Sequence, residues 1–219
     1  MKRKILIFSA GPGGKEVYQL IKSINKNDNK KFSWEVLGFV DNALFKKKKK
    51  INNIKIFSSK NCPKNKDIYA ITGVSDPKIR KNIYKNEILK NNYKLTNLIH
   101  PSVEIPTCLD LGKGNIIFSN VHISFEISIK NFTIISNFCD LGHNLKVGNF
   151  FSIMPSSTIG GKCQIGENTF IASGVKIHQN LTIGSNCMIG IGTTVTSNVK
   201  NNFSLINYPR QVLQKIKKK

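Results

Sequence analysis

The sequence predicts two domains of different fold class within 219 residues. Residues 1–97 are expected to form an α/β domain and residues 98–200 an all-β parallel β-helix, with a C-terminal turn and basic tail over 201–219. Two observations support this prediction. A strand, a glycine loop and a helix follow one another at the start, and an aliphatic residue recurs at every sixth position in the second half. The chain is long enough for two small domains.

The first elements are an apolar strand over Lys4–Phe8, a tight loop over Ser9–Gly14 and a helix over Val17–Ile24. This order opens a doubly wound, Rossmann-like fold that binds nucleotides. Glycines let backbone N–H groups approach a phosphate, and the N-terminus of the helix favours its negative charge. The loop lacks the full G-x-G-x-x-G pattern, so it does not by itself predict NAD binding.

A second strand over Trp34–Val40 ends at Asp41, about twenty residues after the loop, where such folds place an acid that hydrogen-bonds a nucleoside. A third strand is expected over Asp67–Thr72 and ends at Gly73. A helix should follow to about Lys90, with Asp76 as its N-cap and Pro77 as its first residue. These elements complete a small nucleotide-binding domain.

The second half of the chain repeats with a period of six. A helix repeats every 3.6 residues and a strand every two, so neither explains this period. A chain that turns a corner every six residues gives three-sided coils of about eighteen residues, stacked as parallel strands about 4.8 Å apart. Sixteen aliphatic residues fit one phase: Ile105, Leu111, Ile117, Ile123, Ile129, Ile135, Leu141, Val147, Ile153, Ile159, Ile165, Ile171, Ile177, Ile183, Ile189 and Val195.

A second inward phase, two residues earlier, holds small or apolar residues that suit a narrow prism, Cys139, Cys163 and Cys187 among them. Glycine often follows the aliphatic residue, as at Gly142 and Gly160, and is expected there for the unusual dihedrals of a tight turn. Five unpaired cysteines favour a reducing compartment, so the protein is expected in the cytoplasm.

The net charge of +22 is concentrated in the N-terminal domain. Residues 1–97 hold 23 basic and 7 acidic residues, whereas residues 98–200 hold 6 and 5. No basic helix, zinc-ligand cluster or aromatic stacking motif accompanies the charge, so we interpret it as solvated surface rich in Lys and Asn that attracts anionic substrates, and we expect no nucleic-acid partner. No apolar stretch is long enough to span a membrane.

The two halves together resemble one family, the bacterial sugar acyltransferases, which include sialic-acid O-acetyltransferases and UDP-4-amino-sugar N-acetyltransferases. Nearly the whole chain takes part. The resemblance rests on Ser9–Gly14, Gly38–Asn42, Ala70–Gly73, Asp76–Arg80, Ile99–Pro101 and Gly142–His143. It implies a hexapeptide-repeat β-helix that winds left-handed, against the usual handedness of crossovers.

The resemblance also implies that the first domain binds the nucleotide of a sugar substrate, with UDP as the expected nucleotide. The glycine loop would wrap the nucleotide, Asp41 and Asn42 would meet the base, and Gly73 would line the same pocket. In the loop, Gly11, Pro12 and Gly13 match the family. One departure is that the family usually carries a histidine where Gly13 stands.

His143 matches the general base of the family. An amine that attacks a thioester must lose a proton, and a neutral imidazole accepts one at neutral pH. The family places a carboxylate directly after this histidine, but here the residue is Asn144, which can only orient the ring. We therefore expect that the base is weaker, or that another acid assists it, with Asp140 or an acid from a neighbouring subunit as the candidates. Of the other histidines, His100, His122 and His178 are expected to be structural or exposed, and their spacing with His143 does not predict a metal site.

Acyl coenzyme A in this family lies in a groove between neighbouring prisms, so the resemblance implies a homotrimer. Gly161, one coil after His143, is expected to stabilise the developing oxyanion through its backbone N–H. Ser152, Ser173 and Ile191 match family positions near the cofactor.

The sequence therefore predicts a cytoplasmic, homotrimeric acetyltransferase without metal. Its expected reaction is direct N-acetylation, by acetyl-CoA, of a UDP-linked amino sugar for surface glycan biosynthesis. Three alternatives remain open: O-acetylation of a sialic acid or another sugar, a non-catalytic scaffold that binds nucleotide sugars, and nucleic-acid binding, which would depend strongly on salt.

Overall fold

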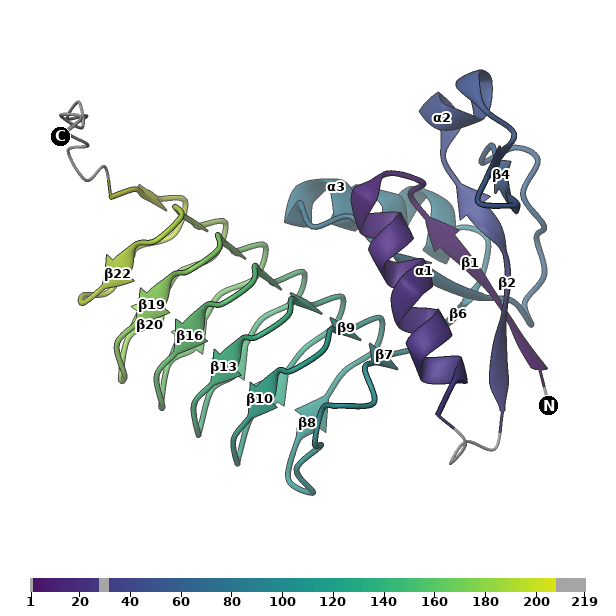
Figure 1. Ribbon diagram of the computed structural model, residues 1–219. Helices are drawn as coiled ribbons and strands as arrows, with labels where there is room; N and C mark the ends of the chain where they lie inside the picture. The colour runs from purple at the N-terminus through teal and green to yellow at the C-terminus, as the bar shows by residue number, and fades with distance from the viewer. Residues whose placement is uncertain (1, 28–31, 208–219) are drawn as a thin grey trace, which may run out of the picture.

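The computed structural model describes residues 2–27 and 32–207 (Figure 1). An α/β domain lies beside the first coils of a β-helix, whose last described coil is at the far end of the molecule. The proposed C-terminal turn and basic tail from Tyr208 onward lie outside the described residues.

The N-terminal domain is built on a six-stranded sheet in the order β3-β4-β2-β1-β5-β6. All neighbouring strands are parallel except β3 and β4. The strands are β1 (Lys2–Phe8), β2 (Ser33–Val40), β3 (Lys50–Ile51), β4 (Ile54–Phe57), β5 (Tyr69–Thr72) and β6 (Lys94–Leu95). The three strands predicted from the sequence are therefore present.

The helices begin where capping chemistry favours them. Helix α1 (Pro12–Asn25) starts inside the glycine loop, with Pro12 in its first turn. Helix α3 (Pro77–Ile83) has Asp76 as N-cap, and its carboxylate accepts from Ile79 N at 2.9 Å. The expected helix to about Lys90 continues as a π-helical segment, η1 (Tyr84–Leu89). A short helix not predicted from the sequence, α2 (Asn42–Lys47), follows β2.

The β-helix is a three-sided stack of parallel two-residue strands. The first side contains β7 (Leu98–Ile99), β9 (Ile116–Ile117), β12 (Ile134–Ile135), β15 (Ser152–Ile153), β18 (Phe170–Ile171), β21 (Met188–Ile189) and β23 (Ser204–Leu205). The second contains β10 (His122–Ile123), β13 (Asp140–Leu141), β16 (Thr158–Ile159), β19 (Lys176–Ile177) and β22 (Thr194–Val195). The third contains β8 (Asp110–Leu111), β11 (Ser128–Ile129), β14 (Lys146–Val147), β17 (Gln164–Ile165) and β20 (Thr182–Ile183).

From β7 to β22, strand partners on each side are eighteen residues apart, as the period of six predicts, whereas β21 and β23 pair sixteen residues apart. Two boundary details differ from the prediction. Strand β23 pairs with β21, so the β-helix continues past residue 200. Ile105 is 47% exposed, because no strand forms there in the first coil.

The two inward phases fill the prism. The aliphatic residues from Ile117 onward are buried, and so are Cys139, Cys163 and Cys187 of the second phase. All five cysteines are free thiols. Burial raises the pKa of the Cys139 thiol to about 11, so it packs as a neutral group.

The glycines after the aliphatic residues are required for close stacking, which corrects the expectation of unusual dihedrals. A Cβ on Gly142 would lie 2.6 Å from Gly161 N in the next coil. The left-handed conformation occurs two residues later, at the third position after the aliphatic residue, for example at Asn144 with φ 56°. Asparagine tolerates this conformation better than most residues, which explains part of its abundance.

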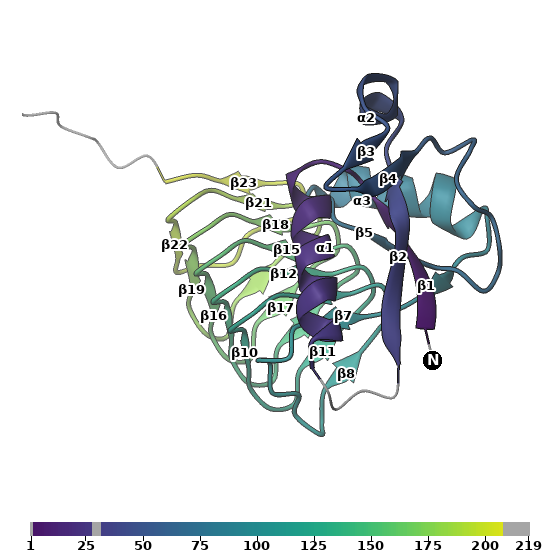
Figure 2. The same ribbon diagram turned by 45° about the vertical axis from the view of Figure 1, so that its right-hand side comes forward.

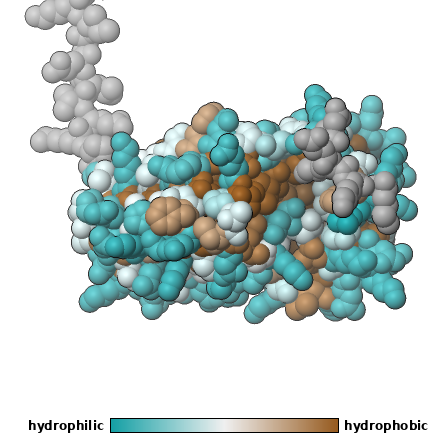
Figure 3. Space-filling view, turned by 90° about the horizontal axis from the view of Figure 1, so that it is seen from below, coloured by the Kyte–Doolittle hydropathy of each residue, from teal (hydrophilic) through white to brown (hydrophobic). Residues whose placement is uncertain are grey.

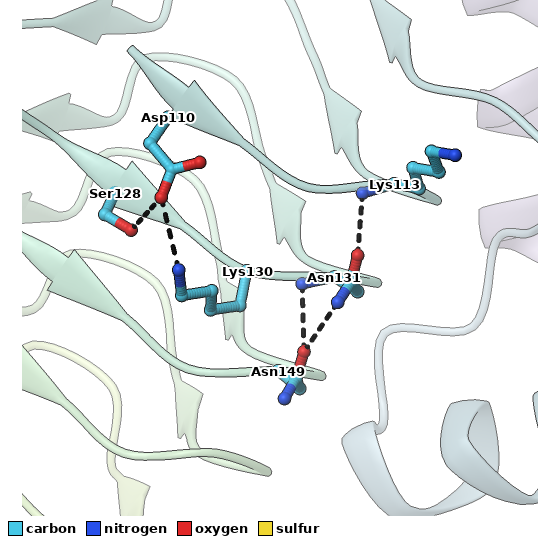
Figure 4. Close-up of polar contacts among 6 residues, drawn as sticks. All are labelled: Asp110, Lys113, Ser128, Lys130, Asn131 and Asn149. Carbon is cyan, nitrogen blue, oxygen red and sulfur yellow. Dashed lines mark hydrogen bonds and ion pairs between the residues drawn. The ribbon is translucent and has the colours of Figure 1, made fainter.

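Asparagine side chains also link successive coils at another corner (Figure 4). The Asn131 side chain accepts from Lys113 N at 2.8 Å, and Asn149 accepts from both the backbone and the side chain of Asn131 at 3.1 Å. Each link spans eighteen residues and satisfies a backbone donor at a turn. The interpretation of asparagine as solvated surface alone is therefore incomplete.

The two domains share a hydrophobic core. Helix α1 lies along the first side of the β-helix (Figure 2), and its Val17 and Leu20 belong to the same buried cluster as Leu98, Ile116 and Ile134. This contact covers the outward-facing residues of the first side near its N-terminal end. Within the described part of the chain, no helix has the length and apolar character needed to cross a membrane.

Candidate active site

His143 lies at the corner between the second and third sides of the prism, as its place after Leu141 in β13 requires. The imidazole is half-buried and stacks on Phe125 of the preceding coil, with ring centroids 5.3 Å apart and planes 9° from parallel. On the other side is Gly161 of the next coil, where a Cβ would lie 2.5 Å from His143 Nε2. The ring is thus held between two coils at the surface.

The other ring nitrogen is bound to Asn144. His143 Nδ1 lies 2.7 Å from Asn144 Oδ1, and Asn144 Nδ2 donates to Glu126 Oε2. Glu126 was not predicted, although it lies eighteen residues before Asn144 and the repeat could have identified it. Asp140 is not the missing acid, because its carboxylate lies 2.7 Å from His122 Nδ1 on the second side.

Gly161 has a free backbone donor, which an oxyanion site needs. The Gly161 N–H has no hydrogen-bond partner among residues 2–27 and 32–207. The neighbouring Lys162 N donates to His143 O at 2.7 Å and fixes the two coils relative to each other. These contacts place a backbone donor next to the imidazole.

The three residues predicted to contact the cofactor do not gather around His143. Ser152 is fully buried and donates to Ser75 O at 2.6 Å, so it joins the two domains. This location does not support a cofactor contact. Ser173 is half-buried, Ile191 is 74% exposed, and both follow strands of the first side, at its corner with the second.

A cavity of about 390 Å³ lies between the two domains. It brings together four of the residues predicted to bind the nucleotide, Gly11, Pro12, Gly13 and Gly73. The β-helix contributes the opposite wall from its first side, through Phe118, Ile134, Ser136 and Met154.

The loop packs tightly against the strand end at Gly73. A Cβ on Gly13 would lie 2.0 Å from Gly73 O, so this backbone has no room for a histidine at that position. Gly11 is different, since the nearest atom to its Cβ would be Ser9 Oγ at an ordinary 3.6 Å. Glycine at position 13 therefore permits this close contact between loop and strand.

Asp41 and Asn42 lie outside the lining of this cavity. The Asp41 carboxylate accepts from Ala10 N at 3.0 Å and, as the N-cap of α2, from Ala43 N and Leu44 N at 3.1 and 2.9 Å. The Asn42 side chain bonds to Ser59 through both its oxygen and its nitrogen. Both residues have structural partners that the sequence did not predict.

Arg80 is a further residue that sequence analysis missed. Its guanidinium is fully buried and donates to four carbonyl oxygens, at 2.7 to 3.0 Å: Val74 and Ser75 in the first domain, Phe132 and Phe151 in the β-helix. Burial lowers the pKa of Arg80 to about 9, which leaves it charged at neutral pH. This side chain ties the wall of the cavity at Val74 and Ser75 to the prism.

The remaining histidines lie apart from this site. His122 pairs with Asp140, His100 contacts Ser102 Oγ at 2.9 Å, and His178 is exposed. In the described part of the chain, no three His, Cys, Asp or Glu residues are arranged to hold a metal ion.

Two family models match the sequence in the order of these domains. The PglD N-terminal domain matches residues 4–86, and the bacterial transferase hexapeptide of six repeats matches residues 144–179. The chain thus combines a PglD-type N-terminal domain with bacterial transferase hexapeptide repeats. The predicted family is confirmed. No curated protein sequence matches this transferase significantly.

Solved structures match the transferase over nearly its whole length. The acetyltransferase domain of PglB from Neisseria gonorrhoeae FA1090 is 21% identical, with a TM-score of 0.83 over 96% of this chain and 100% of that one. PerB from Caulobacter crescentus, solved with CoA and GDP-perosamine, is 18% identical, with a TM-score of 0.81 over 96% and 97%. WeeI from Acinetobacter baumannii AYE is 16% identical, with a TM-score of 0.74 over 97% and 100%. At these identities the likeness establishes the fold, and the predicted class, a Rossmann-like α/β domain followed by a left-handed β-helix, is confirmed.

Proposed function

We propose that this transferase moves an acetyl group from acetyl-CoA to the amino group of a nucleotide-linked sugar, with His143 as the general base. The observation that carries the proposal is the setting of the imidazole. It lies half-buried at a corner of the prism, its Nδ1 is bound to Asn144, and Gly161 lies over the face of the ring at Nε2. The PglB domain solved with acetyl coenzyme A, and PerB with CoA, support acetyl-CoA as the donor.

The chemistry follows from these positions. The sugar amine attacks the thioester carbon, so a C–N bond forms while His143 Nε2 takes the proton of the amine. The Gly161 N–H is placed to donate to the oxyanion of the tetrahedral intermediate. The C–S bond then breaks, and the imidazolium returns the proton to the leaving thiolate, which restores the neutral base and releases the thiol of coenzyme A.

The cavity between the domains is the proposed site for the nucleotide sugar. It is bordered by the glycine loop at the N-terminus of α1, where backbone N–H groups favour phosphate. PerB binds a nucleotide sugar, GDP-perosamine, which supports this class of substrate. We assign UDP as the nucleotide from the sequence resemblance, and GDP is the alternative that an assay has to include.

The active unit is proposed to be a homotrimer, because one chain does not bring the two sites together. The cavity lies on the first side of the prism, whereas His143 lies at the one corner that does not border this side. A cyclic trimer sets different surfaces of neighbouring copies against each other, so His143 of one copy can reach the cavity of the next.

Apolar side chains on the outside of the β-helix support such contacts. Phe125, Phe138 and Ile191 are 54%, 62% and 74% exposed in the single chain. The space-filling view shows apolar surface among the polar residues of one face (Figure 3). Exposed apolar surface of this kind is typical of interfaces. Ser173 and Ile191, at the corner between the first and second sides, are then proposed to contact the cofactor from a neighbouring copy.

The cellular role that fits this reaction is the supply of N-acetylated sugars for surface glycans, in the cytoplasm. The scaffold alternative loses support, because Asn144 connects His143 to the carboxylate of Glu126. O-acetylation of a sugar hydroxyl uses the same base and remains the second candidate.

The test is release of coenzyme A thiol from acetyl-CoA with a panel of acceptors. The panel contains UDP- and GDP-linked amino sugars, the matching hydroxy sugars without an amine, and sialic acid. We expect release only with an amino sugar nucleotide, and a product heavier by one acetyl group on nitrogen. Release with the hydroxy sugars would instead support O-acetylation, and no release with any acceptor, despite nucleotide binding, would contradict the proposal.

A further inference from the structure

His143 is connected to a carboxylate indirectly. Its ring contacts Asn144, and Asn144 donates a hydrogen bond to Glu126. We propose that Glu126 is a positioning residue that fixes the tautomer of His143 through the side-chain amide of Asn144. The catalytic consequence rests on the proposed function, whereas the tautomer itself does not. The basis is the pair of contacts from Asn144, to His143 Nδ1 at 2.7 Å and to Glu126 Oε2.

The first step is the orientation of the amide. An ionised carboxylate offers only acceptors, whereas an asparagine side chain has a donor end and an acceptor end. Asn144 must therefore turn its NH₂ group toward Glu126, and the hydrogen-bond network assigns the amide in this way. Its oxygen then faces the imidazole.

The second step is the location of the proton on the ring. Asn144 Oδ1 can only accept, so His143 Nδ1 must carry the hydrogen that lies between them. A neutral imidazole has one N–H, which leaves Nε2 with a free lone pair. Gly161, the residue whose N–H is without a partner in the described part of the chain, lies over the face of the ring at this nitrogen.

The geometry of the repeat explains why Glu126 holds this place. Glu126 and Asn144 are eighteen residues apart and both adopt the left-handed conformation, with φ of 55° and 56°. Their side chains therefore leave equivalent positions of adjacent coils and meet. Phe125 and His143 are aligned in the same way in the neighbouring column, and their rings stack. Stacking on Phe125 holds the imidazole of His143, and the hydrogen bond to the Glu126 carboxylate holds the amide of Asn144.

Asp140 provides a matched control, because its carboxylate contacts a different histidine, His122, also eighteen residues away. The Glu126–Asn144 pair and the Asp140–His122 pair share the spacing of eighteen residues but lie at different places on the prism. Only the Glu126 pair leads to the corner where Gly161 lies.

The direct test is nitrogen NMR of the protein labelled with ¹⁵N in its histidines, which reads the tautomer without any substrate. We expect the neutral His143 ring of the wild type to carry its proton on Nδ1. In Glu126→Gln, the new amide can donate or accept, so Asn144 can turn over and both tautomers should appear. Asp140→Asn should leave the His143 signals unchanged. A wild-type ring protonated on Nε2, or an unchanged tautomer in Glu126→Gln, would overturn the proposal.

Kinetics then test the consequence for turnover. We expect Glu126→Gln to lower kcat about tenfold, or 1.4 kcal/mol, with KM nearly unchanged, since the base and not substrate binding is altered. The double variant Glu126→Gln/Asn144→Asp returns a carboxylate to the ring and should recover most of kcat. An undiminished kcat in Glu126→Gln would contradict the role in turnover. If the transferase proved to have another activity, the NMR result would still decide the tautomer.

Discussion

The two domains hold their functional groups in opposite ways. The β-helix presents side chains, because a corner of a rigid coil holds His143 between Phe125 and Gly161. The N-terminal domain presents mainly backbone, because its loop borders the cavity with Gly11, Pro12 and Gly13 next to Ser9. Substitutions at the corner should therefore change the chemical step, and those in the loop should change binding or packing.

The largest effect is expected at the corner of the β-helix. His143→Ala should lower kcat by about 10² to 10⁴-fold, the usual contribution of a general base, and leave the fold intact because the ring lies at the surface. Steady-state kinetics with acetyl-CoA and an amino sugar nucleotide measure this, with circular dichroism as the check on folding. Turnover at the wild-type level would show that the chemical step does not take place at this corner.

The next largest effect is expected at the contact between the domains, where a substitution should lower the free energy of unfolding. Arg80→Met keeps an unbranched apolar stem but removes the guanidinium donor from four carbonyl oxygens. Ser75 O and Phe151 O keep a second donor, whereas Val74 O and Phe132 O lose the donor they have. We expect a loss of roughly 2 to 4 kcal/mol in the free energy of unfolding, as for two acceptors left unsatisfied. Chemical denaturation at a fixed protomer concentration measures it. A loss below about 1 kcal/mol would mean that the Arg80 hydrogen bonds contribute little to the contact between the domains.

Substitutions at two glycines of the loop Ser9–Gly14 should distinguish an effect on substrate binding from an effect on packing. A side chain on Gly11 meets only Ser9 Oγ at 3.6 Å, so Gly11→Leu should fold normally and occupy the cavity that it borders. We expect KM for the nucleotide sugar to rise about tenfold, or 1.4 kcal/mol, with little change in KM for acetyl-CoA.

Gly13→Ala is the matched comparison, because its Cβ would lie 2.0 Å from Gly73 O. Here the expected result is a loss of stability of roughly 2 kcal/mol from overpacking. Thermal unfolding of both variants distinguishes the two positions. Equal stability of Gly11→Leu and Gly13→Ala would show that the loop is not packed on Gly73 as described.

The smallest effect is expected on the flat second side. His122 and Asp140 form a histidine–carboxylate pair at 2.7 Å, but both side chains are mostly exposed and lie away from the corner. His122→Ala should keep kcat within about twofold of wild type, since exposed pairs of this kind contribute little. A large fall in kcat would show that the active site extends onto this face.

The β-helix could be predicted closely because its period fixes which side chains face inward. The same period places His143 outward, and it also aligns Glu126 with Asn144. The sequence suggested Asp140 as the replacement acid because it is close to His143 in the chain. Glu126 was missed because it is far from His143 in the chain and lies one coil before Asn144. Ile105 departs from the pattern because the first coil forms no strand there, and the dihedrals of Gly142 could not be inferred from its position alone.

The contacts between the domains could not be predicted, because they join residues far apart in the sequence. Ser152 was expected near the cofactor because it matches a family position, but the N-terminal domain covers it at Ser75. Arg80 bonds to Phe132 and Phe151 across 52 and 71 residues, and no local pattern marks such a contact. Asp41 has the expected place after β2, yet its carboxylate is used by three backbone N–H groups.

The central claim is that His143 of one copy acts on a substrate held in the cavity of another. The most direct measurement is the activity of mixed trimers, from His143→Ala and Gly11→Leu chains that carry different tags, are co-expressed and are purified through both tags. If the site is shared, each mixed trimer should contain one intact site of three, since a site needs an intact cavity and an intact histidine from the neighbouring copy. The assay is done at a nucleotide-sugar concentration well below the wild-type KM, where Gly11→Leu chains are expected to retain only about a tenth of the activity. Mixed trimers no more active than either parent variant would contradict the account.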